Sequence, residues 1–310
     1  MTRSLVIGGN GFIGSHLADK LTSMGRDVTV FDRFSHGIQN YNSRNVRQRV
    51  GDFLNVDDLR NAVKGQDEVF HFLSVTTPAT AHSDPLLDIR VNTGQSVELF
   101  SACASAGVGM LYFASTGGAI YGENSAPKVS EHNPTSPKSP YAISKLSLEH
   151  YLEYFRLTRD LDYRIFRISN PYGPRQNPIK PQGLIPIVLR QILEGNPIQK
   201  FGDGSMIRDY IYVSDLVDMI STTLNVPSNH RVYNVGSGVG KSINEVLATV
   251  RQVTGSDLSI EYRPSPPTYV RRVVLDTTRF HSDFGAFQAI SLDEGVARTW
   301  QSIRESAKAR

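Results

Sequence analysis

The chain has 310 residues, which is enough for one large α/β domain or for two domains that share an interface. Hydrophobic residues make up 39% and charged residues 20%, a balance typical of a soluble globular protein, and the net charge is only +3. Arg and Lys are scattered and are not interleaved with aromatic residues. We therefore expect no nucleic-acid partner, although the charge would not repel a phosphate-bearing ligand.

The N-terminal sequence, the apolar segments and the cysteine content predict the cellular location of the protein. The N-terminus leads directly into Leu5-Val6-Ile7, without the basic segment, apolar run and cleavage site of a signal peptide. No apolar stretch approaches the ~20 residues of a membrane span. The single cysteine, Cys103, cannot form an internal disulfide, and its apolar surroundings favour packing within a helix. We therefore expect a cytoplasmic protein with no membrane partner.

The first half of the chain alternates short β-branched runs with helical patterns. The predicted strands are Leu5–Ile7, Val28–Phe31, Glu68–Leu73, Met110–Ala114 and Arg164–Ile168. The predicted helices are Phe12–Met24, Val56–Val63, Leu86–Ala106 and Tyr141–Arg159. This alternation predicts an α/β fold with a Rossmann-type, doubly wound parallel sheet, which binds ligands at the carboxyl ends of its strands.

After Ser169 the pattern becomes irregular, with Pro and Gly recurring through Pro186. Later elements are predicted at Ile187–Leu193 (helix), Tyr210–Val213 (strand), Ser214 onward (helix), Val232–Val235 (strand), Ser242–Val253 (helix), Val273–Leu275 (strand) and Leu292 onward (helix). We expect residues 1–169 to form the Rossmann domain, with returning segments around 211–240. Residues 170–310 would mainly form a smaller α/β substrate-binding domain.

A glycine-rich turn lies between the first strand and the first helix. It reads Gly8-Gly9-Asn10-Gly11-Phe12-Ile13-Gly14. Gly8 would permit the tight turn, Gly11 would let a pyrophosphate approach the backbone, and Gly14 would allow the helix to pack closely on the strand. The helix N-terminus then offers N–H groups to the phosphates. Gly8, Gly11, Phe12, Ile13 and Gly14 are therefore candidate dinucleotide contacts, and the first domain is the expected NAD-binding domain.

Acidic residues follow the next two strands. Asp32 ends the second strand, where a carboxylate can bind both ribose hydroxyls and repel a 2′-phosphate, which favours NAD over NADP. Arg33 follows it and could tolerate that phosphate. Between the strand Val28–Phe31 and the helix Val56–Val63, Gly51-Asp52-Phe53 follows a further candidate strand, and there Asp52 could accept a hydrogen bond from the adenine amino group, with Phe53 beside the ring. A solvated loop Asp is nearly as good an interpretation of Asp52.

Tyr141 and Lys145 open the helix that follows Pro140. Their spacing of four places both side chains on one face, one turn apart. A free tyrosine has a pKa near 10 and is a poor base at neutral pH. A neighbouring ammonium and an oxidised nicotinamide would both favour the phenolate and lower that pKa. Lys145 could also bind the nicotinamide ribose. The alternative is an ordinary surface helix with a chance Tyr and Lys.

These residues are similar to those of the extended short-chain dehydrogenase/reductase family, in particular its nucleotide-sugar epimerases. The resemblance covers nearly the whole chain. It rests on the glycine turn, the Tyr–Lys helix and the segments Ser115–Gly122, Asn170–Gln176, Arg208–Val213 and Tyr233–Gly238. It implies an NAD-dependent isomerase of carbohydrate metabolism, acting on a nucleotide-diphosphate sugar, with a UDP-hexose 4-epimerase as the first expectation.

The resemblance also implies a mechanism. Tyr141 would take the proton of the sugar C4 hydroxyl while hydride passes from C4 to NAD, and the 4-keto sugar would turn over and take the hydride back on its other face. Further cofactor residues implied are Leu73, Ser74, Val75 and Asn92. Substrate residues implied are Thr77, Asn170, Leu184, Arg208 and Tyr210. A homodimer paired through Leu86–Ala106 and Tyr141–Arg159 is implied as well.

One departure from the family pattern affects the catalytic centre. Relatives usually carry Ser or Thr four positions before the Tyr of the Tyr-Gly pair, where its hydroxyl polarises the substrate oxygen. This chain has Gly117 there. Thr116 is the best substitute and Ser115 the next, unless both merely end the strand.

Two further departures affect the substrate site. Gly183 stands where some epimerases have an Asn near the sugar or phosphate. An Arg and an Asp that relatives often carry before the Val273–Leu275 strand correspond here to Pro266 and Tyr269. Arg271 or Arg263 is the candidate to replace that phosphate contact.

Three other functions compete with epimerisation. A 4,6-dehydratase needs an acid–base pair after the Ser/Thr, and Gly117-Gly118-Ala119 has no proton-transferring group. A keto-sugar reductase would use NAD or NADP and the same residues, and it stays open. A non-catalytic dinucleotide-binding protein would not require both Tyr141 and Lys145. No metal site is expected.

Overall fold

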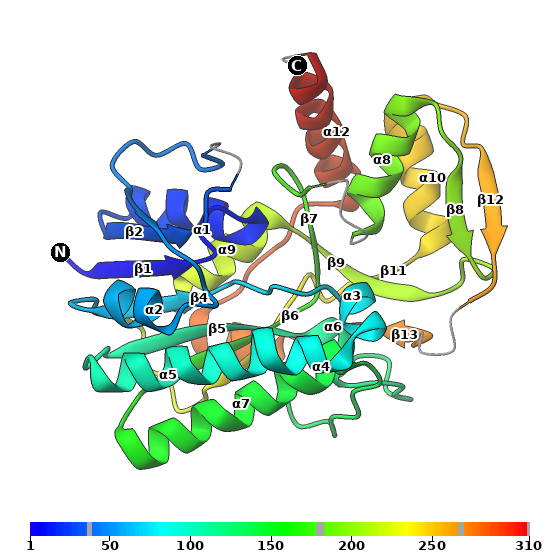
Figure 1. The fold of residues 1–310 in the computed structure, drawn as a ribbon. Coiled ribbons are helices and arrows are strands. Elements are labelled where there is room, and N and C mark those ends of the chain that lie inside the picture. Colours follow the sequence, from blue (N-terminus) through cyan, green and yellow to red (C-terminus); the bar gives the residue numbers. More distant parts are fainter. Residues whose placement is uncertain (36–38, 178–182, 266–269, 309–310) are drawn as a thin grey trace. The chain divides into compact units, whose positions relative to one another are not determined.

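The computed structural model describes residues 1–35, 39–177, 183–265 and 270–308 (Figure 1). The chain divides into two compact units. Unit 1 comprises Met1–Thr116, Ser139–Arg167 and Val217–Tyr233, and unit 2 comprises Gly117–Lys138, Ile168–Leu216 and Asn234–Arg310. Pro266 and Tyr269 lie outside the described residues. The assignment of cofactor binding and substrate binding to separate domains stays a prediction.

A seven-stranded sheet has the strand order β10-β6-β5-β4-β1-β2-β3. Its strands are β1 (Arg3–Ile7), β2 (Asp27–Asp32), β3 (Arg47–Val50), β4 (Glu68–His71), β5 (Met110–Thr116), β6 (Tyr163–Ile168) and β10 (Val232–Val235). The pairs β1–β2, β2–β3, β1–β4 and β4–β5 run parallel. Chain order reverses direction at β1, so the predicted Rossmann-type, doubly wound fold is confirmed.

Apolar residues explain why these strands pair. In β1, Leu5, Val6 and Ile7 are all fully buried, as expected for a parallel strand that is covered on both faces. The helices around the sheet include α1 (Phe12–Ser23), α2 (Val56–Val63), α5 (Gln95–Ser105), α7 (Pro140–Arg159) and α9 (Val213–Thr222). In unit 1, α2, α5 and α7 share one apolar cluster with β1, β4 and β5. Cys103 lies in that cluster, and burial raises the pKa of its thiol.

The predicted helix Leu86–Ala106 is confirmed in extent, but it contains a π-helical segment that was not predicted. The structure has α4 (Pro85–Asp88), a π-helix η1 (Ile89–Gly94) and then α5. Asp84 caps α4 through the backbone N–H of Leu87, and α3 (Pro78–Ser83), which was not predicted, precedes it. The π-helix turns inward at Asn92, whose side chain binds backbone and side-chain groups of the segment after β4. Such π turns are common at functional sites.

Unit 2 contains two small sheets. In the larger one, β9 (Ile207–Tyr212) pairs with β11 (Gly240–Ser242), β13 (Arg272–Val273) and β7 (Asn170–Tyr172); in the other, β8 (Ile198–Phe201) pairs with β12 (Ile260–Arg263). The helices are α6 (Gly117–Ile120), α8 (Leu184–Glu194), α10 (Ile243–Thr254), α11 (Thr278–Phe284) and α12 (Leu292–Lys308). Residues of α8, α10 and α12 bury a second apolar cluster. The predicted strand Val273–Leu275 is thus shifted toward the N-terminus, with Leu275 bridging Val129.

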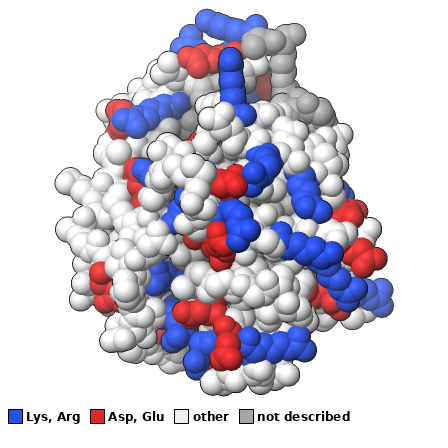
Figure 2. All heavy atoms as spheres, turned by 90° about the vertical axis from the view of Figure 1, so that its left-hand side faces the viewer, with Lys and Arg blue, Asp and Glu red and all other residues white. Residues whose placement is uncertain are grey.

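Among the described residues, no helix combines the length and the apolar character needed to cross a bilayer. On the face drawn in Figure 2, basic and acidic side chains are interspersed. Exposed ion pairs of this kind, such as Arg47 with Asp27, contribute little to stability.

Candidate active site

The glycine turn after β1 is closely packed. Gly8 has a φ of +77°, and a Cβ on it would lie 2.8 Å from the Cβ of Leu73. A Cβ on Gly14 would lie 2.3 Å from the carbonyl oxygen of Gly8, so α1 can approach β1 only with glycine there. Gly11 is the N-cap of α1 and has no side chain to cap it, which leaves N–H groups of the first turn, at Phe12 and Ile13, available to an anion.

Asp32 lies at the carboxyl end of β2, beside this turn. One carboxylate oxygen accepts a hydrogen bond from the N–H of Asn10 (3.2 Å) and the other from the N–H of Arg33 (2.8 Å). The side chain of Arg33 is exposed. A glycine-rich turn that offers backbone N–H groups, followed by a carboxylate at the next strand end, fits a dinucleotide, with the carboxylate at the ribose.

Asp52 and Phe53 follow β3. A carboxylate oxygen of Asp52 accepts from the N–H of Leu54, 3.0 Å away. The ring of Phe53 is buried and lies 5.4 Å from the ring of His71. Because Phe53 packs in the core, the expectation that its ring lies beside adenine is not supported by its placement. Both interpretations of Asp52 stay open.

The segment after β4 is held by Asn92. The side-chain oxygen of Asn92 accepts from the N–H of Val75 (2.8 Å), and its amide donates to the hydroxyl of Thr76 (2.6 Å). Leu73 is partly buried, whereas Ser74 is exposed. Asn92 therefore positions this segment with both ends of its amide, and any part it has in cofactor binding acts through the backbone it holds.

Tyr141 and Lys145 lie together at the start of α7. Ser139 caps this helix through the N–H of Ala142, and Pro140 occupies its first turn. The Lys145 amine lies 5.9 Å from the centre of the Tyr141 ring. It donates to the carbonyl of Ala114 at 2.8 Å and lies 4.7 Å from the centre of the Phe113 ring, so it is anchored at the end of β5.

Burial dominates the proton affinities of this pair. It raises the pKa of Tyr141 to about 12, and the charge of Asp88 adds to that rise. It lowers the pKa of Lys145 to about 8, against the opposing charges of Asp88 and Glu149. The predicted lowering of the Tyr141 pKa by Lys145 is therefore outweighed in the chain alone. A further positive charge is needed to favour the phenolate.

Ser115 and Thr116, the last residues of β5, differ in their hydrogen bonds. The hydroxyl of Ser115 donates to Glu149 at 2.5 Å. Glu149 also forms a buried ion pair with Arg167, at 2.7 Å between the closest atoms. In the part of the chain that the structure describes, the Thr116 hydroxyl has no hydrogen-bond partner. Of the two candidates for the hydroxyl missing at Gly117, Thr116 is the one still available.

The predicted substrate residues have varied surroundings. In unit 2, the amide of Asn170 donates to the carbonyl of Asp209 at 3.0 Å. Arg208 donates to its neighbour, the carbonyl of Ile207 (2.8 Å), and burial raises the pKa of Tyr210 to about 12. In unit 1, Thr77 caps α3 through the N–H of Thr80.

The positions that depart from the family pattern also lie in unit 2. Gly183 has a φ of +93° before Leu184, the first residue of α8, and a Cβ there would meet Gln176 at 2.5 Å. An Asn at this position would therefore be strained. Arg271 is almost fully exposed, and its side chain is paired with Glu123 at 3.4 Å. Its part in phosphate binding stays a prediction.

Several buried polar residues were missed from the sequence. Asp209, fully buried in β9, accepts hydrogen bonds from the backbone N–H groups of Ser237 and Gly238. Asn234 uses its whole amide inside unit 2, accepting from Tyr121 and donating to the carbonyls of Val129 and Asp276. The motifs Arg208–Val213 and Tyr233–Gly238 thus include structural clamps as well as candidate ligand contacts.

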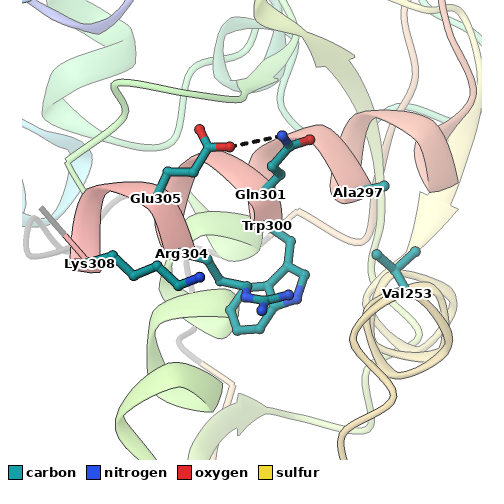
Figure 3. Close-up of a pocket in the computed structure, with 7 residues that line it drawn as sticks. All are labelled: Val253, Ala297, Trp300, Gln301, Arg304, Glu305 and Lys308. Carbon is teal, nitrogen blue, oxygen red and sulfur yellow. Dashed lines mark hydrogen bonds between the residues drawn. The ribbon is translucent and has the colours of Figure 1, made fainter.

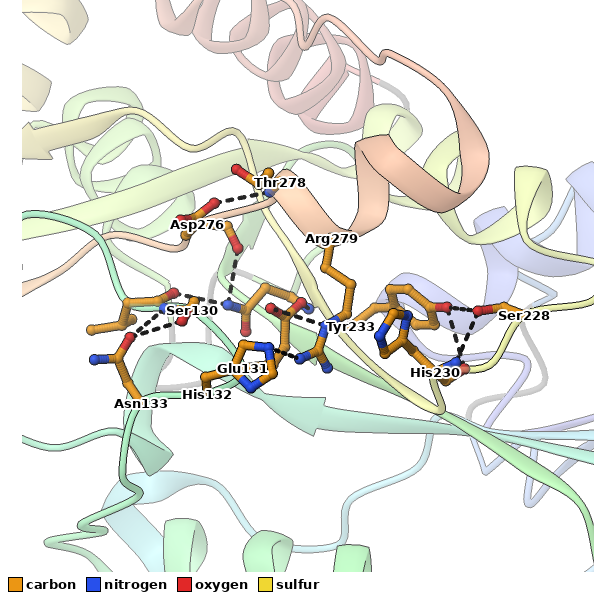
Figure 4. A network of polar contacts seen from close by, with 12 residues as sticks. Ser130, Glu131, His132, Asn133, Ser228, His230, Tyr233, Asp276, Thr278 and Arg279 are labelled. Atoms are coloured by element: carbon orange, nitrogen blue, oxygen red, sulfur yellow. Dashed lines mark hydrogen bonds and ion pairs between the residues drawn. The ribbon is translucent and has the colours of Figure 1, made fainter.

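Figure 4 shows a neighbouring part of that network, in which Arg279 reaches Glu131 and His132. In unit 1, Asp88 and Glu149 were missed too. A pattern in the sequence could have indicated them: polar residues recur every four positions on otherwise apolar helix faces, at Asp88, Asn92 and Ser96 and at Tyr141, Lys145 and Glu149.

A groove of about 360 Å³ lies elsewhere, between α10 and α12 (Figure 3). Its lining residues are Val253, Ala297, Trp300, Gln301, Arg304, Glu305 and Lys308, and none of them is a predicted site residue. Gln301 donates to Glu305 across one turn of α12. The groove is therefore separate from the candidate active site.

The doubly wound sheet, the glycine turn, the acidic end of β2 and the Tyr–Lys helix define a dinucleotide-binding enzyme of the Rossmann type. Residues 4–236 match the model of the NAD dependent epimerase/dehydratase family. The chain belongs to this family, and the resemblance found in its motifs is confirmed.

Known proteins are similar to this chain over nearly its full length. The UDP-glucose 4-epimerase of Mycolicibacterium smegmatis is 33% identical, over 99% of this chain and 100% of its own. The structure of UDP-glucose 4-epimerase from Thermotoga maritima with UDP-glucose has a TM-score of 0.92 and 34% identity, covering 99% of this chain and 100% of its own. The Thermus thermophilus UDP-glucose 4-epimerase complex with NAD has a TM-score of 0.91 and 33% identity, covering 98% and 99%.

Proposed function

We propose that this chain is an NAD-dependent UDP-sugar 4-epimerase. The observation that carries the proposal is the placement of Tyr141 beside Lys145 at the end of β5, in a chain that is similar to 4-epimerases from end to end. The three structural and sequence relatives named above all carry the name UDP-glucose 4-epimerase. A UDP-hexose is therefore the first substrate to test.

NAD fits the residues of unit 1. The turn at Gly8, Gly11 and Gly14 receives the pyrophosphate, and Asp32 binds the ribose hydroxyls. Other residues assigned to this cofactor site are Phe12, Ile13, Arg33, Asp52, Leu73, Ser74, Val75 and Asn92, whereas the ring of Phe53 is packed in the core and is left out. When bound, NAD supplies the acceptor, and then the donor, of hydride for the sugar carbon.

The chain's own residues handle the proton. Tyr141 takes it from the C4 hydroxyl and returns it when the 4-keto sugar is reduced on the other face. Lys145 keeps a positive charge beside the phenol, held in place by the carbonyl of Ala114. Thr116 donates a hydrogen bond to the substrate oxygen, with Ser115 as the weaker candidate because Glu149 occupies its hydroxyl.

The nucleotide sugar is bound by residues that carry hydrogen-bonding groups or a positive charge. We assign this role to Thr77, Asn170, Gly183, Leu184, Arg208, Tyr210 and Arg271. Arg208 is the main phosphate ligand, because a guanidinium binds phosphate oxygens through two parallel hydrogen bonds.

Dehydration is disfavoured by the first turn after β5. A 4,6-dehydratase requires an acid and a base in addition to the Tyr–Lys pair, and α6 begins with Gly117, Gly118 and Ala119. None of the three can transfer a proton.

The decisive experiment supplies UDP-galactose and no reductant to the purified protein with NAD, and follows UDP-glucose by chromatography. We expect conversion to an equilibrium mixture, and a loss of about 1,000-fold or more in turnover for Tyr141→Phe with NAD still bound. UDP-N-acetylgalactosamine and UDP-galacturonate, run in parallel, identify the preferred sugar. A protein that converts none of these, but reduces a keto sugar with NADH, is a reductase.

Assembly and location are also part of the proposal. Seven large apolar side chains are exposed on α4, η1 and α7, namely Leu86, Leu87, Ile89, Ile143, Tyr151, Tyr154 and Leu157. A homodimer that pairs these helices would cover them. A cytoplasmic location matches the substrate class and stays a prediction.

A further inference from the structure

A stripe of buried polar side chains runs along α4, η1 and α5. Asp88, Asn92 and Ser96 are spaced four residues apart, and none is more than 7% exposed. Ser96 contacts the imidazole of His71 in β4 at 2.8 Å. Asn92 holds the segment after β4, and Asp88 is the one charged member of the stripe.

The carboxylate of Asp88 joins three elements of unit 1. One of its oxygens accepts hydrogen bonds from the hydroxyl of Thr76 and from the amide of Asn92, the latter at 2.8 Å. The other accepts from the hydroxyl of Ser144, which lies on α7 immediately before Lys145. Asp88 is fully buried, and in the described part of the chain it pairs with no Lys or Arg.

Removing a charge from water is expensive, and three hydroxyl and amide donors are the only direct compensation in view. The connecting role uses both carboxylate oxygens, one for Thr76 and Asn92 and the other for Ser144. A neutral amide has a single acceptor oxygen, so it would keep these contacts only if the hydroxyl of Ser144 turned round to accept a hydrogen bond. The connection therefore accounts for the carboxylate, and its negative charge has a second consequence.

That charge acts on the catalytic pair. It raises the pKa of Tyr141 beyond the effect of burial, and it raises the pKa of Lys145 against the effect of burial. Two other groups face Lys145. Glu149, four residues further along α7, is already paired with Arg167. His71 is held neutral, since burial and Lys145 place its pKa well below the usual value.

We propose that Asp88 is a positioning residue of this site: its buried carboxylate ties the end of β4 and the π-helix to α7, and holds a negative charge beside Tyr141 and Lys145. The inference rests on the proposed function of that pair. Asp88 keeps Lys145 protonated although it is buried. It also keeps Tyr141 neutral until a positive charge arrives with the oxidised cofactor, so the base forms only in the loaded site.

The test is the pH dependence of kcat/KM in Asp88→Asn, in which an amide replaces the carboxylate at nearly the same size. A negative charge favours the protonated form of a phenol and of an ammonium alike. Its removal should therefore move both the acidic and the alkaline limb to lower pH, each by about one unit. A role in connection alone would lower kcat and leave both limbs in place, which would overturn the proposal.

Asp84→Asn is the matched control. This substitution makes the same chemical change four residues earlier in the chain, at a side chain that is exposed. Asp84 caps α4, and Asn caps a helix as well as Asp does. Solvent screens its charge, so its profile should coincide with that of the unaltered protein. If Asp84→Asn shifts the limbs equally, the effect is one of net charge and not of Asp88.

A second readout needs neither turnover nor cofactor. Carbon-13 NMR of the Lys145 side chain, assigned by its loss in Lys145→Met, should titrate near pH 8 in the unaltered protein and about one unit lower in Asp88→Asn. This measurement separates the two proposals, because it still reports on Asp88 if no UDP-sugar is converted. An unchanged midpoint refutes the electrostatic role.

Asp88→Ser provides a second neutral variant that keeps a hydroxyl for Asn92 and Ser144. It should shift the Lys145 titration in the same direction. If both neutral variants fail to fold while Asp84→Asn folds normally, the carboxylate is purely structural and the proposal is wrong.

Discussion

Glu149 separates the roles of two adjacent hydroxyls. It sits two helical turns after Tyr141 on α7, and its carboxylate holds both Arg167 and the hydroxyl of Ser115. Because that ion pair is buried, loss of either partner would leave an unpaired charge in the core. Ser115 therefore has a structural partner, and Thr116 stays the candidate for contact with the substrate.

Thr116→Val should slow turnover of the UDP-sugar by about 100-fold, since it removes a hydrogen-bond donor at the oxygen where charge develops while keeping the shape of the side chain. Ser115→Ala should have a smaller effect, because Arg167 still satisfies Glu149. Steady-state kinetics of both variants, with circular dichroism to verify folding, measure the difference. The reverse order would assign the polarising role to Ser115.

Asp32→Ala should weaken NAD binding by about tenfold or more, since hydrogen bonds from the ribose hydroxyls to a carboxylate are lost. Binding of NADP should weaken less or improve, because the repulsion of its 2′-phosphate disappears as well. Calorimetric titration with both cofactors gives the ratio of their dissociation constants. A ratio that does not change would mean that Asp32 is not the ribose ligand.

Among the secondary-structure elements, α1 can pack closely on β1 only because Gly14 has no Cβ atom. Alanine usually stabilises a helix relative to glycine by about 1 kcal/mol. In α1 that gain is reversed, since a Cβ on Gly14 would lie 2.3 Å from the Gly8 oxygen, which is backbone and cannot turn aside. The packing of the fold and the proposed phosphate site therefore depend on the same glycine.

Gly14→Ala should lower the free energy of unfolding by about 1–3 kcal/mol, because the helix must move away from the strand. Gly11→Ala is the matched control: its Cβ would meet only the Gly8 oxygen, at 3.1 Å. It should leave stability nearly unchanged and weaken NAD binding. Urea unfolding and NAD titration of both variants check this contrast, and equal loss of stability in the two would contradict it.

At the scale of the whole molecule, the exposed apolar residues of α7 form a pattern. Ile143, Tyr151, Tyr154 and Leu157 follow one another at spacings of eight, three and three, so they share one face of the helix. Their exposed fractions range from 42% to 66%. In a monomer these apolar side chains would stay in contact with water, which is unfavourable, whereas a helix of a partner subunit would bury them.

Leu157→Arg should therefore raise the dissociation constant of the homodimer by about 100-fold, because a charge would be buried without a partner at the pairing face. Leu193→Arg is the control, since Leu193 is also exposed but belongs to α8 of unit 2, which is not one of the predicted pairing helices. Sedimentation velocity at micromolar concentration distinguishes dimer from monomer. A monomeric unaltered protein, or a dimer untouched by Leu157→Arg, would refute the interface.

The family and the doubly wound parallel fold could be predicted from the sequence because their signals are local. The glycine turn, the β-branched runs and the spacing of Tyr141 and Lys145 depend on residues that are neighbours in the chain or one helical turn apart. The sequence by itself also pointed to the acidic residue at the end of β2. These features would be recognisable in any fold that kept the same segments.

Other features depend on contacts between residues far apart in the chain. The strands β8 and β12 are half-exposed and form only because each supplies the other's hydrogen bonds. The π-helical segment between α4 and α5 lies where Asp88 and Asn92 bind the segment after β4. The proton affinity of Tyr141 was the clearest case: spacing indicated the lysine, but burial and the charge of Asp88 set the direction of the pKa. Burial and long-range charge belong to the folded molecule, so only the tertiary structure could decide them.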